Sequence, residues 1–417
     1  MSLAQRVRSS SSARRLFPLY GSYRRLCAQA DEMDREERLE FRAGQLRRLT
    51  RLAERCGLPA DAISTKADLR GDPARYRRLV PGPVSRAATG GTTGVPLHVE
   101  RSLANVVFEQ ATIDHVIDRC GVDARSARVA VFRGDNIKPP DDQTSPFWRD
   151  DGPSRRVFST IHLNRRNAPQ IGVALAEFRP DILACYPSSL ALLLEYVRNG
   201  LVDVTPRLVV TSSEHVPTSV FADVLSVLGC PLLDYYGQAE RVCFASADQY
   251  GRYRFRHEYG AVRLDRRAGE HHVLGTPFHN SRQLFYRYDT GDTTAGTAAM
   301  ADQDLRLVEL GLLTFDGIGG RSGQNMELPD GRWIMGFSQI ARSVPGMNSV
   351  QFVRTGDWSI DVLVVKGSAF SPSSLEAVAK NLTLKIPSDI EWRFTFADAP
   401  LRSGSGKALV YNDARAR

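Results

Sequence analysis

The sequence DILACY (residues 181–186), followed by RLVVT (207–211) and LLDYY (232–236), decides how this chain folds. Each stretch is short and rich in apolar residues, which is typical of a buried strand. A helical pattern separates each stretch from the next, so strands alternate with helices. This order, with short loops, predicts parallel strand pairing and right-handed crossovers.

The two intervening helices have recognisable ends. The first has a leucine-rich stripe, with Ser188 as its candidate cap and Gly200 as its stop. The second is expected to begin at Thr218 or Ser219 and to close at Gly229.

The carboxyl ends of the three strands are the expected place for a ligand. They read YPS (186–188), SSE (212–214) and YGQAE (236–240). In parallel sheets these ends meet at one edge, and ligands bind beyond it. We therefore expect a site built from these three segments.

The segment YGQAE carries the most specific side chains at that edge. Tyr236 can stack on a base, and Gly237 permits close approach of a ligand to the backbone. Glu240 can hold a hard cation such as Mg²⁺. A core tyrosine followed by a solvated acid is the simpler alternative, and the neighbouring motifs argue against it.

The remaining sequence extends this unit into an α/β protein. Helical patterns at 31–56 and 102–120 precede it, and 260–316 reads as short antiparallel strands. We predict a large domain, residues 1–321, of parallel sheets flanked by helices with an antiparallel, barrel-like portion. A small, mobile α+β domain, residues 322–417, is expected to follow. Its pattern is a hairpin around 328–332, strands at 349–354 and 360–365, a helix capped by Ser371, and a strand at 390–396.

Composition limits the classes of function. The chain has 417 residues, a net charge of +8 and ordinary hydrophobic (42%) and charged (24%) fractions. It contains no apolar run long enough to cross a bilayer. Basic residues are scattered, so nucleic-acid binding is not favoured, and a phosphate-bearing substrate explains part of the excess. Six separated cysteines predict a reducing compartment, the cytoplasm.

The N-terminal segment is basic and serine-rich over residues 6–15. That composition is similar to a transit peptide. A frayed arm leading into a helix is the interpretation we favour.

A glycine- and threonine-rich loop, TGGTTGVP (residues 89–96), precedes the parallel unit. Glycines let backbone N–H groups turn towards an anion, and the hydroxyls add further donors. The loop lacks the lysine pattern of a Walker A loop. It nevertheless predicts a phosphate-binding turn.

Two downstream motifs supply what an ATP-using enzyme needs. RYDTGD (287–292) places Asp292 after a Thr-Gly turn, and a carboxylate is the usual partner of ribose hydroxyls. SGSGK (403–407) is a flexible loop that presents Lys407, which can neutralise charge developing at phosphorus. Only six of the 55 basic residues are lysines, so this one stands out.

Taken in order, these motifs resemble the adenylate-forming (acyl-activating) superfamily. More narrowly, the chain is similar to its phenylacetate–CoA ligase-like and capsule-biosynthesis-type branch. STKADLR (64–70) and the extended motif YGQAERV (236–242) add to the narrower resemblance, which covers roughly residues 60–410. Agreement of five ordered motifs is far more specific than any one of them.

The resemblance implies ATP and Mg²⁺ as cofactors, with CoA as a further candidate. It also implies two half-reactions, in which a carboxylate attacks the α-phosphorus of ATP and a nucleophile then displaces AMP. By motif, the resemblance implies that the ATP phosphates are held by Thr89, Gly90, Gly91, Thr92, Thr93 and Gly94. It implies that the adenine pocket is formed by Ser213, Glu214, Tyr236 and Gly237, and that Mg²⁺ is bound by Glu240. The ribose would be bound by Asp292 and by Arg321 at the hinge, and Lys407 would stabilise the charge that develops during adenylation.

Two departures from the family pattern affect what is expected. Val95 stands where many members have lysine, which loosens the expected pyrophosphate contacts. The hinge continues as SGQN (322–325) without the usual acid, which favours an acceptor other than CoA.

The leading hypothesis is an AMP-forming ligase that activates a small carboxylic acid and transfers it to CoA, a carrier thiol or an amine. One variant activates a non-carboxylate oxyanion such as nitrite for transfer to an amine. A nucleotide-binding homologue without turnover and a basic nucleic-acid binder are the alternatives from other classes. The substrate pocket is expected to draw on 132–147, 186–190 and 212–215.

Overall fold

A computed structural model gives the fold of the chain. Residues 10–416 are described, except 79, 90–96, 134–136, 140, 268, 320–325, 335–336, 341–343, 345–346, 367–369, 398–400 and 402–409. The glycine–threonine loop beyond Thr89, the hinge arginine Arg321 and Lys407 therefore lie outside the described residues.

The three strands expected from the sequence form the centre of an eight-stranded sheet. β6 (Ile182–Cys185), β7 (Leu208–Ser212) and β8 (Leu232–Gly237) pair in parallel, as predicted. The sheet order is β10-β9-β8-β7-β6-β3-β5-β4. The other strands are β3 (Val129–Phe132), β4 (Trp148–Asp150), β5 (Arg155–Phe158), β9 (Phe244–Ala247) and β10 (Tyr253–Phe255).

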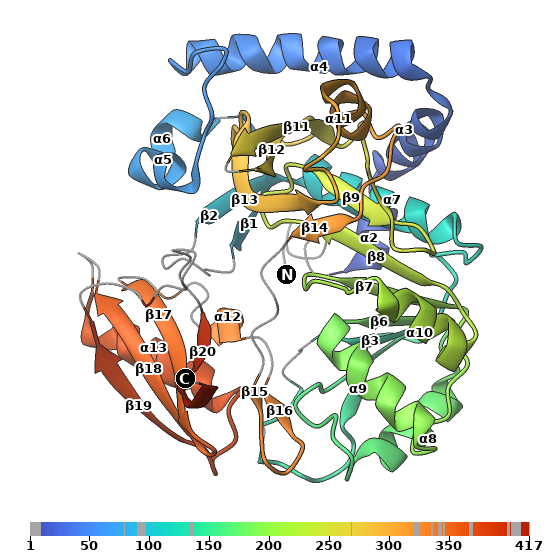
Figure 1. The fold of residues 1–417 in the computed structure, drawn as a ribbon, viewed down its shortest axis with the longest axis vertical. Coiled ribbons are helices and arrows are strands. Elements are labelled where there is room, and N and C mark those ends of the chain that lie inside the picture. The colour runs from blue at the N-terminus through green and yellow to red at the C-terminus, as the bar shows by residue number, and fades with distance from the viewer. Residues whose placement is uncertain are drawn as a thin grey trace.

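Helices cover both faces of this sheet, which makes it a three-layer α/β unit (Figure 1). Leu183, Val209 and Leu232 belong to the core shared with the helices of one face. Leu208 and Leu233 point the other way, into the core shared with the opposite helix. The first face carries α8 (Ala168–Phe178), α9 (Pro187–Arg198) and α10 (Ser219–Leu228); the second carries α7 (Leu103–Asp118).

The helix ends follow the sequence with one correction. Helix α10 begins after Thr218 and closes at Gly229 in the left-handed conformation, as predicted. Helix α9 instead begins at Pro187 with Tyr186 as its N-cap, so Ser188 is not the cap. Proline is favoured at the first helical position because its missing N–H needs no partner there.

A second sheet is antiparallel, as the sequence predicts for residues 260–316. Its order is β11-β12-β13-β14. The register between β12 and β13 shifts between His272 and Leu274, opposite the turn where Gly291 takes a φ of 73°. The strands are β11 (Gly260–Arg267), β12 (Glu270–Pro277), β13 (Tyr288–Ala295) and β14 (Gly317–Gly319), with α11 (Asp302–Glu309) between the last two.

The C-terminal part has its own sheet and its own core. The sheet order is β19-β18-β17-β20, and the core cluster runs from Met326 to Val410. Sequence patterns located all of these strands except β20, which pairs in parallel with β17. The division at 321/322 and the mobility of this part stay predictions. The elements are β15 (Met326–Glu327), β16 (Trp333–Ile334), α12 (Phe337–Ile340), β17 (Met347–Gly356), β18 (Ser359–Lys366), α13 (Pro372–Thr383), β19 (Glu391–Phe396), β20 (Tyr411–Asp413) and a 3₁₀ turn (Ala414–Ala416).

The N-terminal segment is folded where the structure describes it. Ser11–Arg15 forms helix α2, which corrects the expected frayed arm for these residues. The helix expected at 31–56 is present, but it begins at Arg35, because Asp34 and Glu37 form a capping box there, and residues 31 and 32 end the preceding helix. The elements are α3 (Tyr20–Glu32), α4 (Arg35–Arg55), α5 (Lys66–Gly71) and α6 (Pro73–Tyr76).

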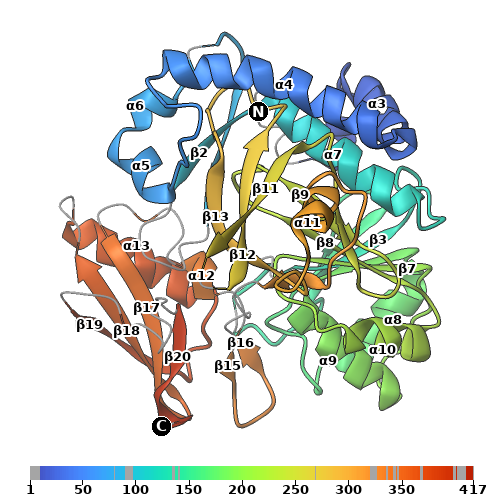
Figure 2. The same cartoon turned by 45° about the horizontal axis from the view of Figure 1, so that its top comes forward.

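Helix α4 spans the antiparallel sheet (Figure 2). Leu49 of this helix shares a small core with Ala261 of β11 and with Phe278. Within the described residues, no helix combines the length and apolar character needed to cross a bilayer.

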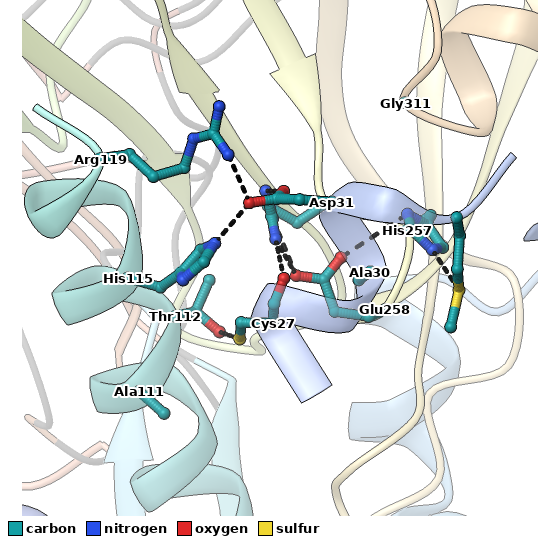
Figure 3. A network of polar contacts seen from close by, with 12 residues as sticks. Cys27, Ala30, Asp31, Ala111, Thr112, His115, Arg119, His257, Glu258 and Gly311 are labelled. Atoms are coloured by element: carbon teal, nitrogen blue, oxygen red, sulfur yellow. Dashed lines mark hydrogen bonds and ion pairs between the residues drawn. The ribbon is translucent and has the colours of Figure 1, made fainter. Parts of the chain in front are cut away.

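A buried ionic network joins α3 to α7 and to the turn after β10 (Figure 3). The Asp31 carboxylate lies 2.7 Å from His115 Nε2 and 2.8 Å from Arg119 Nη1. Arg256 pairs with the same carboxylate and with Glu258, at 2.7 Å. Burial alone would raise the pKa of Asp31, but the His115 hydrogen bond and the Arg256 charge hold it well below its usual range.

Replacing Asp31 is expected to destabilise the fold. Asp31→Ala leaves the Arg256 guanidinium, whose side chain is 11% exposed, with one carboxylate instead of two. We expect the free energy of unfolding to fall by about 3 kcal/mol, because removing one partner of a buried ion pair leaves the other charge buried without that partner. Urea unfolding measures it, with exposed Asp61→Ala as the control, expected within about 0.5 kcal/mol of the unmodified chain. Equal losses in both variants would contradict a structural role for the network.

Two buried histidines are expected to make the stability of the fold depend on pH in the mildly acidic range. Burial lowers the pKa of His257 and of His279 from 6.5 to about 4. Each therefore binds a proton more readily in the unfolded chain, so stability is lost as pH falls from about 6.5 towards about 4. We expect a loss of about 2 kcal/mol per histidine between pH 6.5 and pH 5. The free energy of unfolding, measured at several pH values across this range, should depend less steeply on pH in a His257→Gln/His279→Gln variant. An unchanged pH dependence would refute the assignment.

Candidate functional site

The expected ligand edge exists at the carboxyl ends of β6, β7 and β8. Cys185 pairs with Thr211, and Ser212 pairs with Tyr235, so the three ends are level with one another. Side chains alternate along a strand. Tyr235 accordingly belongs to the core on the α7 side, whereas Tyr236 packs against the core on the other face.

Tyr236 meets Asp292 at this edge. Its phenol donates a hydrogen bond of 2.8 Å to Asp292 Oδ2, across 56 residues of sequence. Burial, and next the Asp292 charge, raise the pKa of Tyr236 well above its usual value. The phenol therefore stays protonated and donates throughout the physiological range. Two motifs that the sequence singled out separately thus form one contact.

Glu240 is held by the same strand, β13. The Tyr288 phenol donates a 2.7 Å hydrogen bond to Glu240 Oε1, and the Glu240 side chain is largely buried. Strand β13 thereby orients both Tyr236, through Asp292, and Glu240, through Tyr288. Within the described part of the chain, no group of three or more His, Cys, Asp or Glu side chains is arranged to hold a metal.

Glu214 has a structural partner at the edge. Its carboxylate accepts hydrogen bonds from Ser188 N (2.9 Å) and Ser188 Oγ (3.1 Å), at the first turn of α9. A negative charge is favourable at a helix N-terminus. Burial nevertheless raises the pKa of Glu214 above its usual value. The neighbouring Ser213 has a φ of 77°, a strained conformation of the kind found at ligand sites.

Thr89 closes the base of the glycine–threonine loop. β1 (Val84–Ala88) and β2 (His98–Ser102) form an antiparallel hairpin whose connection contains that loop. Thr89 N donates to Leu97 O, and Leu97 N donates to Thr89 Oγ1, both at 3.0 Å. The Thr89 hydroxyl therefore fixes the entry and exit of the loop.

A cavity of about 580 Å³ opens beside this edge. Ser213 and Gly237 line it from the ends of β7 and β8, and Ala88 lines it from the hairpin. The volume is within the range of small-molecule sites. The cavity therefore touches two of the segments that the sequence assigned to nucleotide binding, and Ala88 directly precedes a third, the glycine–threonine loop.

The cavity wall is strongly basic. Glu109 is the acidic residue among the described residues of the wall, and it pairs with Arg241 at 3.3 Å and with the Tyr259 phenol. Burial, and next the Arg241 charge, lower the pKa of Arg101 to about 9 and that of Arg14 to about 10. The arginines of the wall are Arg14, Arg86, Arg101, Arg133 and Arg241.

Seven of the site residues expected from the sequence lie among the described residues, and the structure brings six of them to one edge of the sheet or its cavity. The seventh, Thr89, lies at the base of the adjoining hairpin. The described residues are Thr89, Ser213, Glu214, Tyr236, Gly237, Glu240 and Asp292; those outside are Gly90, Gly91, Thr92, Thr93, Gly94, Arg321 and Lys407. The ligand roles of both groups stay predictions.

The basic wall is the part that the sequence did not reveal. Of the pocket segments expected, 132–147 contributes Arg133, and 212–215 contributes Ser212 and Ser213. Arg241 directly follows Glu240 in its motif, which was a usable signal. No sequence signal pointed to Arg14, because this residue reaches the cavity only through the packing of α2 against α7.

Comparisons with known proteins identify no family. No family model matches the chain, and no curated protein matches it. Among solved structures, 2-hydroxyisobutyryl-CoA ligase in complex with 2-HIB-AMP and CoA is 14% identical, with 99% of this chain and 93% of that chain covered and a TM-score of 0.46. Amide bond synthetase McbA from Marinactinospora thermotolerans is 16% identical (78% and 67% covered, TM-score 0.39), and Mycobacterium smegmatis MbtA is 14% identical (89% and 78% covered, TM-score 0.37).

These similarities are too low to assign an activity, since each TM-score is below 0.5. The observed architecture is a mixed α/β protein with a separate C-terminal sheet, as the sequence predicts.

A double-mutant cycle tests the contact between Tyr236 and Asp292. We expect Tyr236→Phe and Asp292→Asn to show a coupling energy of about 2 kcal/mol in urea unfolding, because the acceptor is charged. Asp289 lies on the same strand but pairs with Arg267. The control cycle of Tyr236→Phe with Asp289→Asn should be additive within about 0.5 kcal/mol. Additive behaviour in both cycles would show that the phenol and Asp292 do not interact.

Proposed function

We propose that this protein is an AMP-forming ligase that activates a small carboxylic acid with ATP. A carboxylate oxygen of the acid attacks the α-phosphorus, and pyrophosphate leaves, giving an acyl-adenylate. A nucleophile then attacks the acyl carbon, loses its proton and displaces AMP. The acceptor is a thiol, of CoA or a carrier protein, or an amine; the hinge sequence after Arg321 favours a non-CoA acceptor.

The observation that carries this proposal is the convergence of Tyr236, Glu240 and Asp292 at the end of β8. In the proposed site, the ring of Tyr236 stacks on adenine and the Asp292 carboxylate accepts from a ribose hydroxyl. The hydrogen bond between these two side chains holds both in place before ATP binds. Such preorganisation lowers the entropy cost of binding.

Glu240 would hold a magnesium ion in the proposed site. Mg²⁺ keeps several waters and takes one or two protein carboxylates together with substrate phosphates. Among the described residues, the Tyr288 phenol is the hydrogen-bond partner of this carboxylate, and it occupies Oε1. Bound there, the ion would screen the negative charge of the phosphates.

The glycine–threonine loop and Lys407 complete the proposed site. Backbone N–H groups and the hydroxyls of Thr92 and Thr93 would hold the phosphates while Thr89 pins the ends of the loop. The ammonium of Lys407 would stabilise charge at the α-phosphate in the first half-reaction. Withdrawal of Lys407 from the site would free it for the second nucleophile.

Removing Lys407 tests turnover separately from binding. We expect Lys407→Ala to lower acid-dependent pyrophosphate release by about 100-fold or more, the scale of losing one charge-stabilising group. ATP affinity, measured by calorimetry, should change only a few-fold.

Lys380→Ala is the matched control, because Lys380 is an exposed lysine on α13 in the same C-terminal part. It should release pyrophosphate at the unmodified rate. Equal activity in both variants would overturn the role of Lys407. Failure of the unmodified protein to bind ATP would overturn the proposal itself.

A further inference from the structure

The cavity beside the ligand edge has a charge that the proposed nucleotide contacts do not require. Its wall carries five arginines, Arg14, Arg86, Arg101, Arg133 and Arg241, drawn from five separate segments of the chain. Guanidinium groups in a shared cavity repel one another, and burial removes the water that would screen them. A ligand must compensate this charge if the cavity binds anything.

The protein's own acids compensate only part of the charge. Glu109 pairs with Arg241, and Glu100 lies 3.5 Å from Arg86 at the rim. Arg101 donates to the Ala239 carbonyl rather than to a carboxylate. Arg133 has no carboxylate within 4.0 Å among the described residues. The guanidinium groups of Arg101 and Arg133 thus lack an ionic partner in the described part of the chain.

Arg133 is the strongest single indicator of a ligand. Its Nη1 donates a hydrogen bond of 3.1 Å to the Tyr235 phenol oxygen, and its guanidinium lies 5.7 Å from the centre of that ring. Its Nε is buried and has no hydrogen-bond partner among the described atoms. A buried unpaired donor is costly, so such groups mark places where a ligand or ion supplies the acceptor.

Arg14 is brought to the wall by a dedicated anchor. The next residue, Arg15, makes a two-point ion pair with the buried Asp114 of α7, at 2.8 Å for each bond. Tyr20 donates to the same carboxylate at 2.7 Å, and Gln110 bridges Asp114 to Arg14. The cavity wall is therefore built across the α2–α7 contact.

We infer that the acid activated by this protein is a polyanion, carrying at least one further carboxylate or phosphate group that the cavity arginines bind. This inference rests on the proposed function. Ser213 and Gly237, which belong to the proposed nucleotide site, also line the cavity, so the reacting carboxylate is placed beside these two residues. The second anionic group is placed against Arg14, Arg101 and Arg133 of the same wall. Arginine suits both carboxylate and phosphate because its planar fork binds either in a two-point geometry.

An alkyl or aryl monocarboxylic acid fits this wall poorly. Its apolar part would face guanidinium groups and leave them desolvated without a partner. Strand alternation argues against assigning the arginines to the nucleotide base, because Tyr236 and Asp292 pack away from the face that Tyr235 shares with the cavity.

The first test measures anion binding without ATP. Citrate serves as a polyanionic probe and acetate as its monoanionic counterpart, at matched ionic strength, by calorimetry. We expect citrate to bind the unmodified protein and Arg125→Gln equally, since Arg125 is exposed and is not among the described residues of the wall. Arg133→Gln and Arg14→Gln should each weaken citrate binding by about tenfold or more. Equal citrate affinity in all four proteins, or none in the unmodified one, would overturn the inference.

The second test measures ATP–pyrophosphate exchange across mono-, di- and tricarboxylic and phosphorylated acids. We expect exchange with acids that carry two or more anionic groups, and a raised KM for the acid but not for ATP in Arg133→Gln. Arg133→Lys should recover part of the loss.

The outcomes separate the inference from the proposed function. Exchange with monocarboxylic acids alone, or a raised KM for ATP instead of the acid, would overturn the polyanion and leave the ligase in place. Exchange with no acid, while ATP and citrate still bind, would overturn the ligase and the substrate assignment with it.

Discussion

The structure depends on strands that are buried on both faces. β6, β7 and β8 alternate between two cores, one shared with α8–α10 and one with α7. Such strands need an apolar side chain at nearly every position, and helices must cover both sides. Polar residues are therefore displaced to the strand ends, and this concentrates Ser212, Ser213 and the YGQAE segment at one edge. The candidate site follows from the same constraint as the core.

Local features of the fold could be predicted from the sequence. Apolar runs and their punctuation located β6, β7, β8 and the helix after Thr218, because strand period and helix closure act over a few residues. Features that depend on a side chain distant in sequence could not be predicted. Ser188 looked like a cap, but Glu214 satisfies the start of α9 from the next strand end. The break before α4 was missed, although Asp34 and Glu37 had the spacing of a capping box.

The candidate site likewise has features that the sequence predicts and features that it does not. The motifs around Tyr236 and Asp292 could be identified singly, and parallel topology placed one of them at the ligand edge. Their direct contact could not be foreseen, because it depends on how the antiparallel sheet abuts the end of β8. The basic wall was visible only as an excess of arginine in the composition. No local pattern connects Arg14, Arg101 and Arg133, which lie in different parts of the chain.

The packing of α7 joins these observations. Its outer face carries Asp114, a carboxylate that is 1% exposed and binds Arg15, Tyr20 and Gln110. Its inner face packs under β6–β8 through Phe108 and Ile117. Asp114 is thus a positioning residue for the cavity, since it sets where α2 presents Arg14 without itself lining the wall. A buried acid costs stability unless it is fully paired. Here the pairing also fixes the guanidinium of Arg14 in the cavity wall, so the fold and the proposed recognition of an anion rest on the same contact.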